Sequence, residues 1–276
     1  MEKIKRALER ARQEQNAIEP ARNPGAGEVP PERRSGAAVE NISYNQTRVF
    51  SIDPETFRRN RIIIGSGEHA AAETAFKILR TQVEHRLAAR GWNALGVTSP
   101  GPGAGKTMTA INLSIALAQE MHRTVLLVDL DFRNPCVHTR FGCDIEFGLI
   151  DYLLDDVPIT SILVNPGIDR LVILPAGHKA VPNSSELLSS PKMIRFVDEL
   201  KSRYPSRIIV FDLPPLLWSD DTLAFSPYVD STLLVISEGI TTKEELKRVT
   251  EIMEGADVIG TVLNRSTEVQ PAYYYR

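Results

Sequence analysis

The chain has 276 residues, of which 42% are hydrophobic and 24% charged, and its net charge is −3. This length accommodates one large α/β domain with extensions, and the small net charge gives no sign of bulk nucleic-acid affinity, so we expect no nucleic-acid partner. No apolar run reaches the length of a membrane span and the N-terminus lacks a signal-peptide core, so we expect a cytoplasmic protein in which Cys136 and Cys143 are reduced.

Residues 1–16 are predicted to form a basic amphipathic helix. Ile4, Ala7, Leu8 and Ala11 recur at helical spacing, and five Lys and Arg residues crowd the other faces. Two interpretations stay open: a solvated, loosely packed helix, or a docking helix for a partner or an anionic membrane surface.

Residues 17–49 are predicted to be a flexible linker. This stretch is rich in Pro, Gly, Glu and Arg, and its prolines exclude a helix. Compact structure is expected to resume near Phe50 and to continue to residue 265.

The region 50–265 is predicted to be an α/β domain with a mostly parallel sheet and helices on both faces. A long helix is expected over 68–90, before the first core strand. Several of the expected strands are almost entirely apolar, which is typical of strands covered on both faces. The six predicted strands are Ala94–Thr98, Thr124–Leu130, Arg170–Leu174, Arg207–Leu213, Ser231–Ser237 and Val258–Asn264.

The segment Ser99–Thr107, S-P-G-P-G-A-G-K-T, lies between the first strand and a helical pattern. A glycine-rich turn in this context is typical of a phosphate-binding loop, although Pro100 stands where the strict pattern has Gly. Lys106 is expected to reach the β/γ-phosphates and the Thr107 hydroxyl to join a Mg²⁺ shell. The predicted nucleotide-binding residues are Gly101, Pro102, Gly103, Ala104, Gly105, Lys106, Thr107 and Met108.

Asp129 and Asp131 follow the second apolar run, with Arg133 after them. Alternation within a strand would separate the two carboxylates, but at the end of a strand both can turn toward the phosphate site. Such an aspartate binds Mg²⁺ or accepts a proton from an attacking hydroxyl; the alternative is an Asp-rich turn. Arg133 is expected to brace the loop or a neighbouring subunit.

Asp212 ends another apolar strand and precedes Pro214 and Pro215, the form of a Walker B site that holds Mg²⁺. The alternative is a capping Asp. Asn264 and Arg265 follow the last strand and are expected to edge the base pocket, unless they form an ordinary turn. Asp220 and Asp221 are expected to cap the next helix.

The tail, residues 266–276, contains Tyr273, Tyr274 and Tyr275 after a polar stretch. We expect an exposed, mobile segment whose tyrosine hydroxyls accept phosphate. The alternative is an aromatic end that docks on the domain.

These motifs together resemble the bacterial tyrosine kinases of capsule and exopolysaccharide systems. The basic N-terminal helix, Gly91-Trp92-Asn93 and the stretch Val181–Leu188 look like the cytoplasmic form linked to exosortase-type clusters. The resemblance covers about residue 60 to the end. It implies the P-loop fold of the MinD/ParA-like group with ATP and Mg²⁺ as cofactors. It also implies catalytic roles for Lys106, Asp129, Asp131 and Asp212, with metal held by Thr107, Asp129 and Asp212.

The same resemblance implies that the tail tyrosines are autophosphorylated in trans between self-associated subunits. The implied partners are a membrane-embedded activator on a separate chain, related to polysaccharide chain-length regulators, and a phosphotyrosine phosphatase. The activator would recruit the chain to the inner face of the membrane.

Two features separate this chain from related patterns. The positions of the family's oligomerisation motif E-x-x-R-x-x-R are occupied in this chain by Thr74, Lys77 and Arg80, with Glu73 one residue early, so ring assembly stays open.

Switch ATPases of the ParA/MinD type carry a signature Lys where this chain has Gly101, and they lack a tyrosine tail. A nucleotide-dependent scaffold without kinase activity is the third interpretation.

Overall fold

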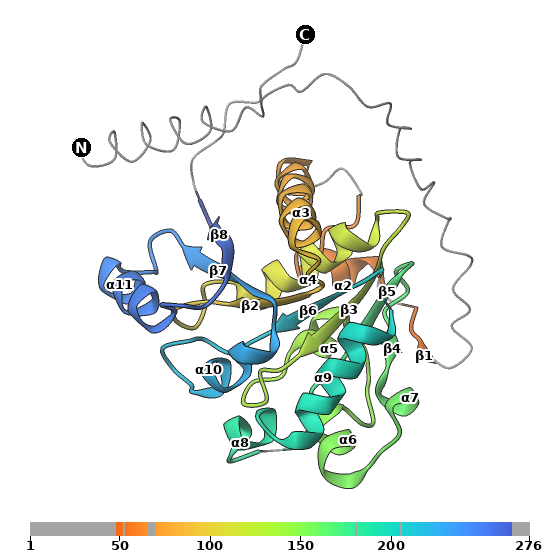
Figure 1. Ribbon diagram of the computed structural model, residues 1–276. Helices are drawn as coiled ribbons and strands as arrows, with labels where there is room; N and C mark the ends of the chain where they lie inside the picture. The colour runs from red at the N-terminus through yellow and green to blue at the C-terminus, as the bar shows by residue number, and fades with distance from the viewer. Residues whose placement is uncertain (1–47, 52, 66–69, 180, 205, 267–276) are drawn as a thin grey trace, which may run out of the picture. The chain divides into compact units, whose positions relative to one another are not determined.

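The computed structural model describes residues 48–51, 53–65, 70–179, 181–204 and 206–266 (Figure 1). The predicted basic helix, the linker up to residue 47 and the tail tyrosines therefore lie outside the described residues. No helix among the residues described is long and apolar enough to cross a membrane.

An eight-stranded sheet in the order β1-β4-β5-β3-β6-β2-β7-β8 forms the centre of the fold. All neighbouring strands are parallel except β4 and β5. The six predicted strands are confirmed, each within one residue at either end. The strands are β1 (Arg48–Val49), β2 (Ala94–Thr98), β3 (Thr124–Asp129), β4 (Val164–Asn165), β5 (Leu171–Leu174), β6 (Arg207–Asp212), β7 (Ser231–Ser237) and β8 (Val258–Asn264).

The short strands β1 and β4 were not predicted, and β1 begins two residues before Phe50. A two-residue strand carries too few side chains to show a period of two, which is the signal that identifies a strand in a sequence. Both strands lie at one edge of the sheet, beyond β5. There β4 pairs with β5 in the antiparallel direction and with β1 in the parallel direction.

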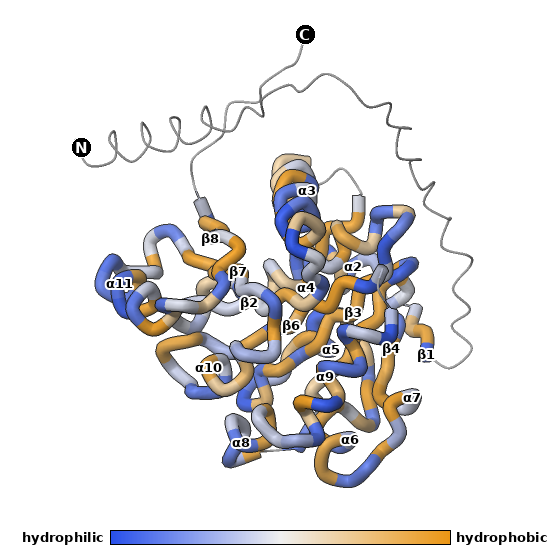
Figure 2. The backbone as a smooth tube through the Cα atoms, in the orientation of Figure 1, coloured by the Kyte–Doolittle hydropathy of each residue, from blue (hydrophilic) through white to orange (hydrophobic). Residues whose placement is uncertain are grey.

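Helices cover both faces of the sheet (Figure 1). One apolar core lies between the sheet and α3 and α4, and a second lies between the sheet and α6, α8, α9 and α10. Figure 2 shows the hydrophobic residues concentrated along the central strands. The helices of four residues or more are α2 (Pro54–Arg59), α3 (Ala70–Arg90), α4 (Lys106–Ala118), α5 (Val137–Phe141), α6 (Leu149–Asp155), α7 (Ile159–Ile162), α8 (Ser184–Leu188), α9 (Pro191–Arg203), α10 (Asp221–Phe225) and α11 (Lys243–Ile252).

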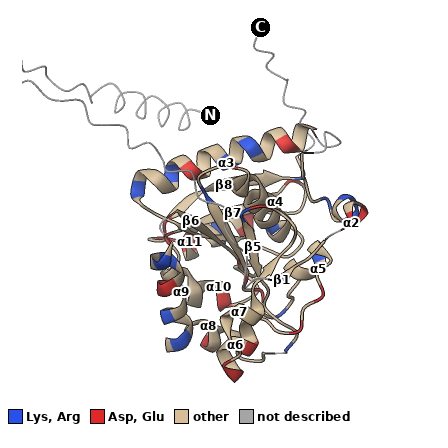
Figure 3. Cartoon of the chain, turned by 90° about the vertical axis from the view of Figure 1, so that its right-hand side faces the viewer, with Lys and Arg blue, Asp and Glu red and all other residues tan. Residues whose placement is uncertain are grey.

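Charged side chains lie mainly on the outer helices, such as α3 and α9, whereas the central strands carry few (Figure 3). The buried exceptions include Asp129 and Asp212, the last residues of β3 and β6. These two residues lie side by side in the ladder between the strands. Because burying a carboxylate is costly unless it is paired, their presence at the strand ends indicates a functional site.

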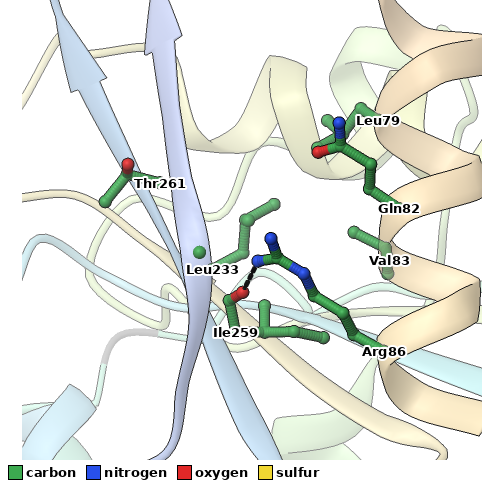
Figure 4. Close-up of a pocket in the computed structure, with 8 residues that line it drawn as sticks. Leu79, Gln82, Val83, Arg86, Leu233, Ile259 and Thr261 are labelled. Carbon is green, nitrogen blue, oxygen red and sulfur yellow. Dashed lines mark hydrogen bonds between the residues drawn. The ribbon is translucent and has the colours of Figure 1, made fainter. Parts of the chain in front are cut away.

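A cavity of about 260 Å³ lies between α3 and the edge strand β8 (Figure 4). Leu79, Gln82, Val83 and Arg86 of α3 face Ile259 across it, and the Arg86 guanidinium donates to the Ile259 carbonyl. None of the predicted phosphate-site residues lines this cavity. It therefore belongs to the packing of the sheet edge rather than to the predicted site.

Candidate active site

The phosphate loop connects β2 to α4 and depends on glycine at its end. Gly105 is the N-cap of α4 with φ +96°, in the left-handed region that favours glycine. A Cβ at this position would lie 2.0 Å from the Asn264 side-chain nitrogen, so any larger residue would displace Asn264. The first N–H groups of α4 are left free of intrahelical partners and point toward the loop, which suits an anion.

Three hydrogen bonds hold the loop from outside. The backbone N–H groups of Leu216 and Leu217 donate to the Ser99 and Pro100 carbonyls at 2.8 and 3.1 Å. The Asn264 Nδ2 donates to the Ala104 carbonyl at 2.8 Å. Asn264, expected at the base pocket, thus has its amide on the phosphate loop, while Arg265 is exposed with φ +59°.

Lys106, the first residue of α4, lies among carboxylates. Its Nζ is 2.8 Å from Asp131 Oδ2, 3.6 Å from Asp212 Oδ1 and 3.2 Å from the Thr107 hydroxyl oxygen. Asp131 is also held by the Asn134 N–H, which donates to Oδ1 at 3.1 Å. The structure therefore brings together residues from three strand ends that are separated by about a hundred positions in the sequence.

Asp129 is fully buried and both its oxygens accept backbone hydrogen bonds. The N–H groups of Cys136 and Val137 each donate to Oδ2 at 3.0 Å, and the Asp131 N–H donates to Oδ1 at 3.2 Å. Asp129 thus folds the loop after β3 back on itself and caps the start of α5. This is the Asp-rich turn that the sequence left as an alternative, formed at the edge of the phosphate site.

Asp212 is also fully buried, but neither of its oxygens has a hydrogen-bond partner in the part of the chain described. The Lys106 ammonium lies 3.6 Å from Oδ1, too far for a hydrogen bond. A buried carboxylate that has one long ion pair and no hydrogen bond is costly, and it favours a second cation. Carboxylate and hydroxyl oxygens suit Mg²⁺, so Asp212 and Thr107 fit this ion. No cluster of three or more acidic, His or Cys side chains among the described residues could hold a metal alone. Nucleotide and water oxygens would complete its shell.

The electrostatics of the site follow from burial and crowding. Burial, and next the neighbouring Asp212, raise the pKa of Asp129 to about 7. Burial likewise raises the pKa of Asp212, and Lys106 opposes this only in part. Burial alone would lower the pKa of Lys106, but Asp212 and Asp131 outweigh it and the pKa is raised. Lys106 therefore stays charged, and Asp131 and Asp212 share it as their ion-pair partner.

This crowding predicts that the metal-free protein loses stability as the pH rises from about 4 to 7. The unfolded Asp129 carboxyl ionises near pH 4, whereas the folded one holds its proton until about pH 7, so the folded chain binds more protons in this window. The loss is up to roughly 4 kcal/mol for a shift of this size. Urea unfolding in EDTA at pH 5 and pH 8 measures it. Asp129→Asn should flatten the pH dependence, and an unchanged slope in that variant would contradict the assignment.

Asp212→Asn should raise the melting temperature of the metal-free protein by about 2–8 °C, because a neutral amide replaces a buried charge that has no hydrogen bond, while Lys106 keeps its 2.8 Å ion pair with Asp131. The same variant should lose the stabilisation that Mg²⁺ and nucleotide give the wild type. Thermal melts with and without Mg-ADP test both effects. Asp129→Asn is the matched control and should lower the melting temperature, since Asp129 accepts three backbone bonds. A lower melting temperature for Asp212→Asn as well would contradict the claim that the Asp212 charge destabilises the metal-free protein.

Arg133 forms an ion pair with Asp221 and a hydrogen bond with Ser184 that the sequence did not predict. Its Nε lies 3.3 Å from both Asp221 Oδ2 and Ser184 Oγ, and the Ser184 hydroxyl donates to Asp221 Oδ1 at 2.7 Å. Asp220 occupies the N-cap position of α10, as expected, but its side chain makes no cap bond, and Asp221 is the first helical residue rather than a cap. Arg133 instead braces the loop after Asp131 against α8 and α10 of the same chain.

Cys136 is a second residue that sequence reasoning did not place at the site. Its Sγ lies 3.9 Å from the Thr107 hydroxyl oxygen, and burial raises the pKa of its thiol. Both Cys136 and Cys143 are free thiols, as predicted. Only their positions after folding, not their spacing, reveal that one of them adjoins the phosphate site.

A parallel α/β sheet with a phosphate loop after β2 and aspartates at the ends of β3 and β6 defines the class of P-loop nucleotide-binding proteins. The chain matches the family described as AAA domain over residues 97–255. It is 32% identical to the tyrosine-protein kinase YwqD of Bacillus subtilis (strain 168), over 68% of this chain and 79% of that protein. The chain therefore belongs to the family of bacterial tyrosine-protein kinases, as the motifs predicted.

Solved structures agree with this assignment. The VpsO kinase domain is 30% identical with a TM-score of 0.64, over 73% of this chain and 100% of that one. The septum site-determining protein MinD with Mg-ADP, from Pyrococcus horikoshii OT3, shares the fold at 23% identity and a TM-score of 0.52, over 64% and 73%. The chain spans about a quarter of the length of some longer relatives. The predicted fold class is confirmed, and the switch-ATPase alternative is not favoured.

Proposed function

We propose that this chain is an ATP-dependent protein-tyrosine autokinase whose acceptors are Tyr273, Tyr274 and Tyr275. The observation that carries the proposal is the buried Lys106 beside Asp131 and Asp212, with Asp212 oxygens that have no hydrogen bond and suit a second cation. Membership of the tyrosine-protein kinase family supports it. The MinD neighbour, which holds Mg-ADP, supports a nucleotide and magnesium at this loop.

The phosphate loop from Gly101 to Met108 would hold the nucleotide phosphates through its backbone N–H groups. Thr107 and Asp212 would hold Mg²⁺, which neutralises phosphate charge when bound. Asp129 would act on the metal through water, because its own oxygens already accept backbone bonds. Asn264 would keep the loop in its binding shape through the Ala104 carbonyl, with Arg265 at the edge of the base pocket.

Asp131 is our candidate for the proton acceptor. Its carboxylate is held by Lys106 at 2.8 Å, and an arriving phosphate competes for the same ammonium. Lys106 then moves to the phosphate, and Asp131 is released to accept the tyrosine proton. The tyrosine oxygen bonds to the γ-phosphorus, the bond from that phosphorus to the β,γ-bridging oxygen breaks, and ADP leaves. Binding of the nucleotide thus prepares the base.

The proposed organisation is a basic amphipathic helix at 1–16, a flexible linker at 17–49, the kinase domain at 50–265 and the acceptor tail at 266–276. By resemblance, we propose phosphorylation in trans within a self-associated assembly that regulates exopolysaccharide synthesis. A chain-length-regulator-like membrane protein would activate the chain and recruit it to the cytoplasmic face of the membrane. A phosphotyrosine phosphatase would reverse the reaction.

The test incubates the purified chain with Mg-ATP, with and without the cytoplasmic segment of a candidate activator, and maps phosphate by mass spectrometry. Phosphotyrosine within 273–275 is the expected result. ATP hydrolysis without phosphotyrosine under either condition would favour a switch ATPase. The absence of both activities would leave the scaffold interpretation.

A further inference from the structure

An exposed aromatic side chain stands beside the first half of the phosphate loop. Trp218 is 69% exposed, and its backbone N–H donates to the Pro215 carbonyl at 3.1 Å. Leu216 and Leu217, directly before it, bond to the loop carbonyls of Ser99 and Pro100. Leu216 is also buried in a small apolar core with Val249 of α11. Trp218 is therefore exposed on a segment that is fixed to the phosphate loop.

The loop residue that Trp218 adjoins has no side chain. A Cβ on Gly101 would lie 3.6 Å from Trp218 Nε1 and 3.3 Å from Glu245 Oε1. Trp218 and Glu245 thus flank the same position, and both lie so close to it that a side chain on residue 101 would crowd them. We call these three residues the Gly101 rim.

Glu245 gives the rim a negative charge that is not neutralised within the described chain. One carboxylate oxygen, Oε2, accepts the Thr242 N–H at 2.8 Å in the capping box of α11. The other oxygen faces Gly101, and no Lys or Arg among the described residues forms an ion pair with it. A carboxylate beside an anion-binding loop is repelled by the phosphates unless a cation lies between them. The rim therefore favours a ligand that brings a positive charge.

We propose that the Gly101 rim docks the acceptor peptide of a second copy of this chain, with a tyrosine ring on Trp218 and the Arg276 guanidinium at Glu245. The sequence Tyr273-Tyr274-Tyr275-Arg276 supplies both groups side by side. Aromatic stacking and a charge-assisted hydrogen bond are each favourable at such a partly exposed site. This inference rests on the proposed kinase function and names the residues that select its acceptor.

The test uses the full chain with Tyr273, Tyr274 and Tyr275 replaced by Ala, so that only an added peptide of residues 265–276 accepts phosphate. Trp218→Ala should raise the peptide KM about tenfold, the effect of losing one stacking contact, while Trp218→Phe should retain most of the affinity. Glu245→Gln, which preserves the capping bonds, should raise KM severalfold for the natural peptide but not for one with Arg276→Ala. An unchanged KM in both variants would overturn the proposal.

Met121→Ala and Glu251→Gln are matched controls: Met121 is 68% exposed outside the site, and Glu251 lies on the same helix as Glu245. The chain has two tryptophans, so Trp92→Phe leaves Trp218 as the single fluorescent indole. The emission of Trp218 should shift on titration with a peptide that carries Phe in place of Tyr, because a Phe ring of the bound peptide then stacks on the indole.

The fluorescence titration tests the docking site at the Gly101 rim separately from the proposed kinase function. A shift without phosphotyrosine from the wild-type peptide would reject the kinase and retain the docking site. Phosphotyrosine without a shift would retain the kinase and reject the docking site. If Trp218→Ala altered only the response to an activator segment, the rim would be an activator site and the proposal would be wrong.

Discussion

Lys106→Met should reduce phosphoryl transfer by about a thousandfold or more, since the charge that stabilises the transferring phosphate is lost. It should also destabilise the metal-free protein by about 3–5 kcal/mol at pH 8, because Asp131 and Asp212 lose their shared cation. The destabilisation should shrink at pH 5, because burial raises the pKa of Asp212 and favours uptake of a proton in place of the lost cation. Phosphotyrosine yield and urea unfolding at both pH values measure these effects.

Lys247→Met is the matched control, because the Lys247 side chain is 80% exposed and its Glu251 partner lies 3.9 Å away. Exposed ion pairs of this kind contribute little, so we expect stability and activity close to the wild type. A Lys106→Met protein that kept a tenth of the activity would show that another cation holds the phosphate. Equal stability at pH 8 would show that the carboxylates do not depend on Lys106.

Asp131→Asn should lower kcat by about 10²–10⁴, the usual contribution of a positioned proton acceptor. The amide oxygen can still accept the Asn134 N–H, so the loop should keep its shape. Nucleotide affinity should change far less than kcat, since the phosphates are held by the loop and Lys106. Single-turnover rates with saturating Mg-ATP, together with nucleotide binding by calorimetry, measure the two quantities separately.

Asp144→Asn is a suitable control because Asp144 is exposed and lies on the next loop. Its kcat should match the wild type. If Asp131→Asn reduced nucleotide affinity as strongly as kcat, Asp131 would hold the metal instead of accepting the proton. A loss of activity that persisted at higher pH, where the tyrosine ionises without a base, would indicate that Asp131 acts by orienting the tyrosine instead.

The sequence predicts the parts of this fold that depend on long, local patterns. Six strand-like runs, several of them almost entirely apolar, identify six strands, and Gly-Lys-Thr after the first of them identifies the phosphate loop. The ends of neighbouring parallel strands meet at one edge of a sheet, so Asp129, Asp131 and Asp212 were expected together. In the structure, Asp131 and Asp212 lie 2.8 and 3.6 Å from Lys106 Nζ, and Asp129 is the ladder partner of Asp212.

What the sequence does not predict is which atoms each carboxylate meets. Asp129 and Asp212 end similar strands, yet one is saturated with backbone bonds and the other has none. That difference comes from the turn before α5, which has no counterpart after β6. Asp221 and Trp218 likewise acquire their surroundings from segments far away in the chain, so no local pattern marks them.

The most direct test of the central claim mixes two inactive proteins. One carries Lys106→Met with its tyrosines intact, and the other has an intact site with Tyr273, Tyr274 and Tyr275 replaced by Ala. With Mg-ATP and any activator that the wild type requires, phosphate should appear on the tyrosines of the Lys106→Met chain alone. If the wild type is phosphorylated but this mixture is not, the Lys106 site does not transfer phosphate in trans to the tail.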